Sequence, residues 1–210
     1  MPETIQLFPI PLAIRLLLDS VSFSNALPYW VHPLVIDYSG REDRVRQALK
    51  RYLGGETPDK AMEIPVPKKD GNSNVWLIPS VNDQIALQAS VSAVAEVIEQ
   101  RSLDKSTVFS CRLNKDPKRL AFLDNQIDGW KQFNSRVQDR CASDRCVLQF
   151  DIRSAYESIE FDAFVKFLHK ATDGHPASGI IERLLTAFSG TRPGFTLYKR
   201  LGLFSRQCVF

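Results

Sequence analysis

The stretch CVLQFDIRSAYESIEF, residues 146–161, decides how this sequence is interpreted. Its apolar run, residues 147–150, has the composition of a buried β-strand and places one carboxylate, Asp151, at the end of that strand. The aromatic Tyr156 follows five residues later. An Asp in such a position can cap a turn, act as a base or ligate a hard cation such as Mg²⁺, which prefers oxygen ligands. On the residues alone these three roles stay open, and the turn-forming role is the commonest.

The length and the N-terminus set limits on the type of protein. The chain has 210 residues, of which 44% are hydrophobic, enough for one large or two small domains. Its N-terminal apolar segment, residues 5–21, is interrupted by Pro9, Pro11 and Arg15 and has no basic start or small-residue cleavage site. It predicts an initial β-strand and a core helix, and no signal peptide or membrane span.

The four cysteines show no pattern of a metal site. No CxxC pair occurs, and no His lies at ligand spacing from a Cys. We therefore expect reduced thiols, a cytoplasmic location and no zinc. The residues concerned are Cys111, Cys141, Cys146 and Cys208.

Charge is divided unevenly along the chain. Residues 1–100 hold 9 Lys and Arg against 12 Asp and Glu, whereas residues 101–210 hold 18 against 12, so the two parts carry −3 and +6. This asymmetry favours a polyanionic partner for the second part. A solvated surface with a basic tail explains the same numbers.

Two further elements, a helix and a hairpin, are predicted between residues 39 and 78. Residues 39–55 have the pattern of a helix with a capping box, Ser39 and Glu42, and a Gly-Gly stop. Two short β-favouring runs, residues 63–67 and 74–78, flank the polar turn KKDGNS and predict a hairpin. The apolar face of the helix consists of Val45, Leu49, Tyr52 and Leu53.

Three further helices are predicted downstream. One covers residues 83–100, and the second begins with Asp116 as its N-cap and Pro117 at its first position. The third follows the strand and Asp151. The mixture has no regular βαβ alternation, which indicates a helix-rich α+β fold. The expected core faces are Leu87, Val91, Val94 and Ile98 in the first, Leu120, Leu123, Ile127, Trp130 and Val137 in the second, and Phe161, Phe164, Val165 and Leu168 in the third.

The order of three blocks resembles the reverse transcriptase family. FDIRSAYESI resembles its motif A, and IPVPKKDG followed by NVWLIPSVNDQIALQA resembles its fingers segments. FSCRLNKD, followed by a helix bearing Trp and Phe, has the spacing of bacterial reverse transcriptases of the phage-defence and retron-like kind. The resemblance covers residues 63–168, about half of the chain.

This resemblance implies a set of site residues. Asp151 and the backbone carbonyl of Ile152 would hold the catalytic Mg²⁺ or Mn²⁺ ions. Tyr156 would be the steric gate, because a ring beneath the sugar excludes a 2′-hydroxyl by overlap; on its own it could equally be a core aromatic.

The resemblance also implies contacts with phosphate. Lys68 and Lys69, on the hairpin, would meet the triphosphate, although a solvated turn would contain the same residues. Arg112 and Arg153 would contact the phosphates of an RNA template or a DNA primer. The implied reaction is RNA-templated DNA synthesis from deoxynucleotides, a nucleotidyl transfer.

The sequence also departs from the family pattern. Asn74 stands where many members have an Arg, and neither an Asp-Asp pair nor a Gly-Leu-Pro-Gln-Gly block occurs. Two-metal catalysis needs further carboxylates, which the family takes from a Tyr-x-Asp-Asp hairpin. Asp162 and Asp173 are predicted in a first helical turn and a Gly-rich loop, and cannot replace that pair.

These departures lead us to expect a truncated or frame-shifted chain that is inactive alone. We predict an N-terminal helical extension (residues 1–62), a right-hand polymerase fingers region (63–145) and a partial palm with a few strands (146–210). Two alternatives stay open. One is a non-catalytic nucleic-acid-binding protein; the other is a subunit whose palm is completed by a second polypeptide.

Overall fold

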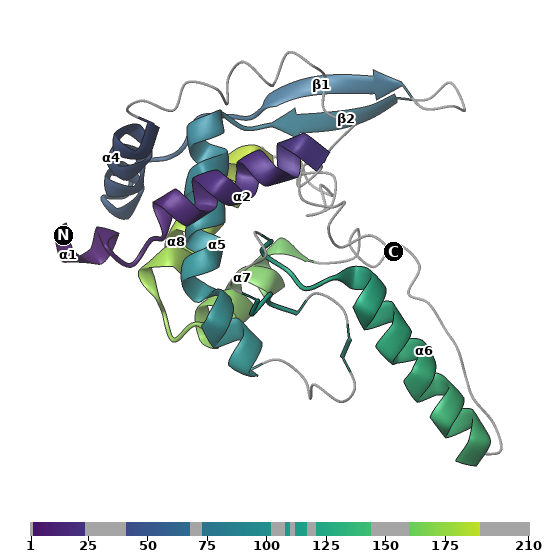
Figure 1. Ribbon diagram of the computed structural model, residues 1–210. Helices are drawn as coiled ribbons and strands as arrows, with labels where there is room; N and C mark the ends of the chain where they lie inside the picture. The colour runs from purple at the N-terminus through teal and green to yellow at the C-terminus, as the bar shows by residue number, and fades with distance from the viewer. Residues whose placement is uncertain are drawn as a thin grey trace.

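The computed structural model describes residues 2–23, 41–67, 73–101, 108–109, 112–116, 121–143 and 160–189. Within these ranges the chain is helix-rich and has one two-stranded sheet (Figure 1). This confirms the coarse prediction of helices with a β-hairpin. The strand predicted at residues 147–150 lies outside the described residues. The elements are α1 (Pro2–Ile5), α2 (Ile10–Phe23), α4 (Arg41–Leu53), β1 (Met62–Pro67), β2 (Ser73–Ile78), α5 (Val81–Arg101), α6 (Gln126–Ser143), α7 (Phe161–Ala171) and α8 (Pro176–Ser189).

Helix α4 ends as its sequence predicts. Gly55 has a φ of 99°, a left-handed conformation that glycine adopts without strain. The amide of Glu56 donates to the carbonyl of Arg51 at 3.0 Å, and that of Gly55 donates to Tyr52 at 3.1 Å, the two bonds of a Schellman cap. The chain therefore leaves α4 in a fixed direction toward β1. Ser39, the predicted N-cap, lies outside the described residues.

The hairpin is confirmed at the predicted position. β1 and β2 pair antiparallel, with Met62 opposite Ile78 and Pro67 opposite Ser73. Pro65 is compatible with this ladder because both strands of a two-stranded sheet are edge strands, where a missing N–H is tolerated.

Helix α5 lies at the centre of the core and contacts α2, α4, α7 and α8. Ala86, Ala89 and Ser90 are fully buried, and such small side chains let neighbouring helices approach closely. Ser90 bonds its hydroxyl to the carbonyl of Ala86 at 2.8 Å, so its burial leaves no unpaired polar group. The predicted apolar residues are also confirmed, since Leu87 and Val94 are buried and Val91 and Ile98 pack at the edge of the core.

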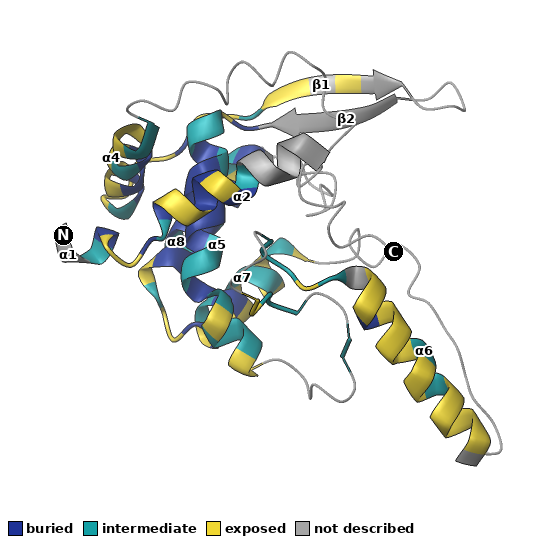
Figure 2. Cartoon of the chain, viewed as in Figure 1, coloured by how far each residue is buried: buried dark blue, intermediate teal, exposed yellow. Residues whose placement is uncertain are grey.

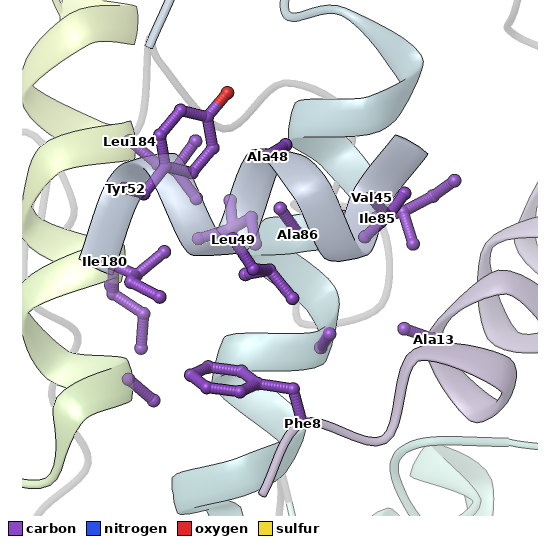
Figure 3. Packing of buried hydrophobic residues seen from close by; sticks show 14 of the residues in the cluster. Phe8, Ala13, Val45, Ala48, Leu49, Tyr52, Ile85, Ala86, Ile180 and Leu184 are labelled. Carbon is purple, nitrogen blue, oxygen red and sulfur yellow. The ribbon is translucent and has the colours of Figure 1, made fainter. Parts of the chain in front are cut away.

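Helix α8 closes the core from the other side, although the sequence interpretation did not predict it. Figure 3 shows Ile180 and Leu184 of α8 facing Leu49 and Tyr52 of α4. Helices from all three predicted segments thus share one hydrophobic core. The segment boundaries themselves stay a prediction.

The turn between α7 and α8 is tied to the end of α5. Asp173 has a φ of 52° and Gly174 one of 69°, which reverses the chain. Arg101 binds the Asp173 carboxylate through Nη1 and Nη2, and its Nη1 also donates to the carbonyl of Lys170 at 3.0 Å. On α7 the predicted apolar face is confirmed. Leu168 is buried, and Phe161, Phe164 and Val165 are half-buried.

The initial strand predicted at the N-terminus is wrong. Residues Pro2–Ile5 form the short helix α1, since Pro is compatible with the first position of a helix. The core helix is confirmed, because Ile10 and Ala13 of α2 are completely buried. None of the described helices is long and apolar enough to cross a membrane.

The predicted start of the second long helix at Asp116 is also wrong. Residues 112–116 and 121–125 form a paired loop, in which Leu113 and Leu123 make an antiparallel bridge. The amide of Asp124 donates to the carbonyl of Arg112 at 2.8 Å. Hydrogen bonds between the two arms of this loop take the place of the hydrogen bonds of a helix. Helix α6 therefore begins only at Gln126, and the side chain of Asn125 caps it.

The predicted core face of α6 is wrong for two large residues. Ile127 is 62% exposed and Trp130 is 56% exposed. Figure 2 shows α6 extending away from the other helices, with most of its described surface exposed. The rings of Trp130 and Phe133 are stacked, with their centroids 5.5 Å apart. The rings of Phe133 and Phe109 meet edge to face, with their centroids 6.3 Å apart. The apolar pattern is therefore present, but the described part of the chain does not cover it.

Candidate functional site

Most of the predicted site residues cannot be placed by the structure. Asp151, Ile152, Arg153 and Tyr156, all in the segment resembling motif A, lie outside the described residues. So do Lys68 and Lys69, between β1 and β2. Their roles stay predictions. The structure does describe Arg112 and the elements that flank the other predicted residues in the sequence, which are the two hairpin strands, the end of α6 and the start of α7.

Arg112 lies at the start of the paired loop and forms an ion pair with Glu99 of α5. Its Nη2 is 2.6 Å from the Glu99 Oε1, and the two side chains are only 13% and 12% exposed. This ion pair joins residues 112–116 to the C-terminal half of α5. A guanidinium has five N–H donors, so a phosphate contact at Arg112 would have to share that group with Glu99.

A groove of about 570 Å³ lies beside this ion pair, between α2, α5 and the paired loop. Its charged lining residues have both signs, with Arg15 and Lys115 opposed by Glu96, Glu99 and Asp116. Such a mixture favours neither an anionic nor a cationic ligand. The remaining lining residues are Leu12, Leu16, Ser92, Ala95, Gln100, Leu113, Asn114, Ala121 and Phe122.

The two later aspartates lie where the sequence predicts. Asp162 is in the first turn of α7, and Asp173 is in the turn after it. The hydrogen bond and the positive charge of Arg101 hold the pKa of Asp173 below its usual range. Asp173 is thus a carboxylate engaged in an ion pair. Among the described residues no group of three or more His, Cys, Asp and Glu side chains could hold a metal ion.

A polar cluster at the base of the hairpin is the best-defined constellation in the described chain. We call Tyr52, Ser80 and Asp83 the root cluster. The hydroxyl of Tyr52 donates to Oδ1 of Asp83, and the hydroxyl of Ser80 donates to Oδ2 at 2.7 Å. The amide of Asp83 returns a bond to the Ser80 oxygen at 3.2 Å, which completes a reciprocal cap of the first turn of α5.

Burial explains the chemistry of this cluster. Asp83 is 2% exposed and Tyr52 is 5% exposed. Burial, the hydrogen bond to Asp83 and the negative charge of that group raise the pKa of the Tyr52 phenol above its ordinary value of 10.0. Tyr52 therefore remains a neutral donor at physiological pH. The positive end of α5 and two hydroxyl donors stabilise a carboxylate that would otherwise be costly to bury.

The sequence interpretation assigned no function to this cluster. Tyr52 belongs to the predicted apolar face of its helix, and Asp83 belongs to the segment that resembles the fingers, in which the resemblance gives it no role. A detectable signal was present, because Ser80 and Asp83 have the Ser-x-x-Asp spacing of a capping box. No local signal links them to Tyr52, which lies 31 positions from Asp83.

No model of a known protein family matches the chain, and a comparison with curated proteins found no match. The family resemblance therefore rests on the motifs themselves and their order.

Proposed function

We propose that this chain supplies the fingers and the motif A segment of a reverse transcriptase-like nucleotidyltransferase. The observation that supports the proposal most is the order of the elements. A β-hairpin with two lysines in its turn is joined by Pro79 and Ser80 to the long helix α5, and the Arg112 block and the segment resembling motif A follow. The hairpin and α5 form where that family pattern needs them.

Each predicted residue has a defined chemical task in this proposal. The Asp151 carboxylate and the Ile152 carbonyl would hold divalent metal, which supplies charge neutralisation and an activated primer hydroxyl for two-metal phosphoryl transfer. Lys68 and Lys69 would bind the triphosphate as mobile point charges. Tyr156 would contact the sugar and exclude a 2′-hydroxyl.

The sugar contact offers a direct test of the proposal. We expect the chain to bind Mg²⁺-dATP more tightly than Mg²⁺-ATP, and Tyr156→Ala to reduce this preference because the excluding ring is gone. Equilibrium binding of fluorescent analogues of the two nucleotides measures both values. Tyr52→Ala is an unsuitable control because Tyr52 lies at the hairpin base. Tyr198→Ala is the matched change outside the motif. Equal affinity for the two sugars in the unaltered chain would contradict the proposal.

A second candidate function is nucleic-acid binding without catalysis. The charge of +6 on residues 101–210 favours it. In this case RNA binding would weaken steeply with salt, since phosphate contacts release counterions. It would also be unchanged in Asp151→Asn, whereas nucleotide binding through metal would be lost in that variant. Filter binding at several salt concentrations separates the two candidates.

A further inference from the structure

The two strands of the hairpin are attached to different helices. β1 follows the loop that leaves α4 at Gly54 and Gly55, and β2 leads into α5 through only Pro79 and Ser80 (Figure 1). The base of the hairpin is therefore defined by two points, the end of α4 and the start of α5. If those points move relative to each other, the direction of the hairpin changes.

The root cluster joins these two points directly. Tyr52 lies in the last turn of α4, two residues before Gly54. Asp83 lies in the first turn of α5, five residues after β2 ends. The hydrogen bond between their side chains thus spans the base of the hairpin, and it is buried.

Two further bonds hold the same junction. The Gln84 Nε2 donates to the carbonyl of Pro79 at 2.9 Å, and the Arg41 Nη1 donates to the Asn82 Oδ1 at 3.3 Å. By contrast, the two strands contact each other far more than they contact any described helix. Among the described residues, the hairpin is consequently attached to the helices mainly at its base.

We propose that Tyr52 and Asp83 are positioning residues that fix the two strands of the hairpin relative to the helical core, so that triphosphate binding by the hairpin depends on them. Neither residue touches the nucleotide in this view. The inference rests on the proposed function only for the identity of the ligand; the mechanical part concerns the hairpin itself. Pre-organisation of this kind raises affinity because less ordering has to accompany binding.

The test compares two variants that each delete a buried hydroxyl contact. Tyr52→Phe removes the donor at the hairpin base. Thr172→Val is the matched control, because the Thr172 hydroxyl contacts that of Ser178 and the carbonyl of Leu168, between α7 and α8. Hydrogen exchange of residues 62–67 and 73–78 is measured in both, together with the dissociation constant of Mg²⁺-dATP.

We expect exchange in the hairpin to accelerate by about twofold to tenfold in Tyr52→Phe, the range that the loss of one hydrogen bond implies. The dissociation constant should rise by a similar factor, while Thr172→Val lowers thermal stability and leaves both values unchanged. Ser80→Ala, which removes the other hydroxyl from the Asp83 carboxylate, should act in the same direction as Tyr52→Phe. It provides the measurement if Tyr52→Phe does not fold.

Three results would decide against the inference or separate it from the proposed function. Unchanged hairpin exchange in both Tyr52→Phe and Ser80→Ala would overturn it. If the unaltered chain binds no nucleotide, the proposed function fails, but faster hairpin exchange in these variants would still support the positioning role. Faster exchange in Thr172→Val as well would show a general loss of stability and would overturn a specific role for the root cluster.

Discussion

Helices α5 and α6 are of similar length, 21 and 18 residues, yet their surroundings differ completely. α5 is covered by four other helices, and its small residues allow close packing. α6 extends away from the core with Ile127 and Trp130 exposed. Both helices have apolar residues at helical spacing. The comparison teaches that periodicity shows that a helix has an apolar face, but it does not show that the described part of the chain covers that face.

The largest difference should appear in stability, between the buried core around α5 and the exposed face of α6. Leu49 of α4, which packs in the core around α5, is completely buried. We expect Leu49→Ala to lower the free energy of unfolding by about 2–5 kcal/mol, since it leaves a cavity. Trp130→Ala on α6 should cost less than about 1 kcal/mol, because its side chain is largely in water already. Urea denaturation measures both, and equal costs would break the comparison.

A second prediction concerns how α6 is attached. Gly129 is buried against Phe109, and a Cβ at this position would lie 2.3 Å from the Phe109 carbonyl oxygen. We expect Gly129→Ala to displace residues 108–109 at a cost of about 1–3 kcal/mol, in the range for overpacking. Hydrogen exchange at Phe109 should accelerate. Gly179→Ala, in helix α8, has nothing within 4 Å of the new Cβ and is the control. Unchanged exchange in Gly129→Ala would show that α6 is not held there.

The third prediction uses the pKa of Tyr52, next to α5. The pKa of Tyr52 is raised in the folded chain, so its phenol contributes fully to the free energy of unfolding below pH 10. Above pH 10 the unfolded chain releases the phenol proton first, and this contribution is lost as the pH rises. The slope should approach about 1.4 kcal/mol per pH unit for this group. Tyr52→Phe should lose this part of the pH dependence. Identical slopes in both proteins above pH 10 would contradict the assignment.

The smallest effect is expected for the ion pair at the end of α5. Arg101 and Asp173 lie at the surface, where water and salt screen the pair. Arg101→Ala should therefore change the melting temperature less than any substitution above, and less still in high salt. A large decrease, measured by circular dichroism, would mean that this pair orders the turn between α7 and α8.

The parts of the fold that were predictable from the sequence have local causes. The end of α4 follows from Gly54 and Gly55, and the hairpin follows from two β-favouring runs around a polar turn. The face of α7 follows from its apolar spacing. The start of α6 was not predictable in this way, because the pairing of Leu113 with Leu123 competes with a helix and depends on residues ten positions apart.

The candidate site also has features with local causes and features that depend on non-local packing. The Ser80–Asp83 cap has a recognisable local spacing, whereas the hydrogen bond of Tyr52 to Asp83 depends on how α4 packs on α5. Sequence reasoning could place Tyr52 on a buried face, but not its hydroxyl. The predicted nucleotide contacts at Lys68, Lys69 and Asp151 rest on motifs, and only binding measurements test them.

The most direct measurement for the central claim is calorimetric titration of Mg²⁺-dATP into the unaltered chain and into Asp151→Asn, with Asp162→Asn as the control. The account predicts metal-dependent nucleotide binding that is lost in Asp151→Asn and kept in Asp162→Asn, because the proposed function assigns the metal to Asp151 and not to Asp162. Nucleotide binding of equal strength in the unaltered chain and Asp151→Asn, or binding that does not need Mg²⁺, would contradict it.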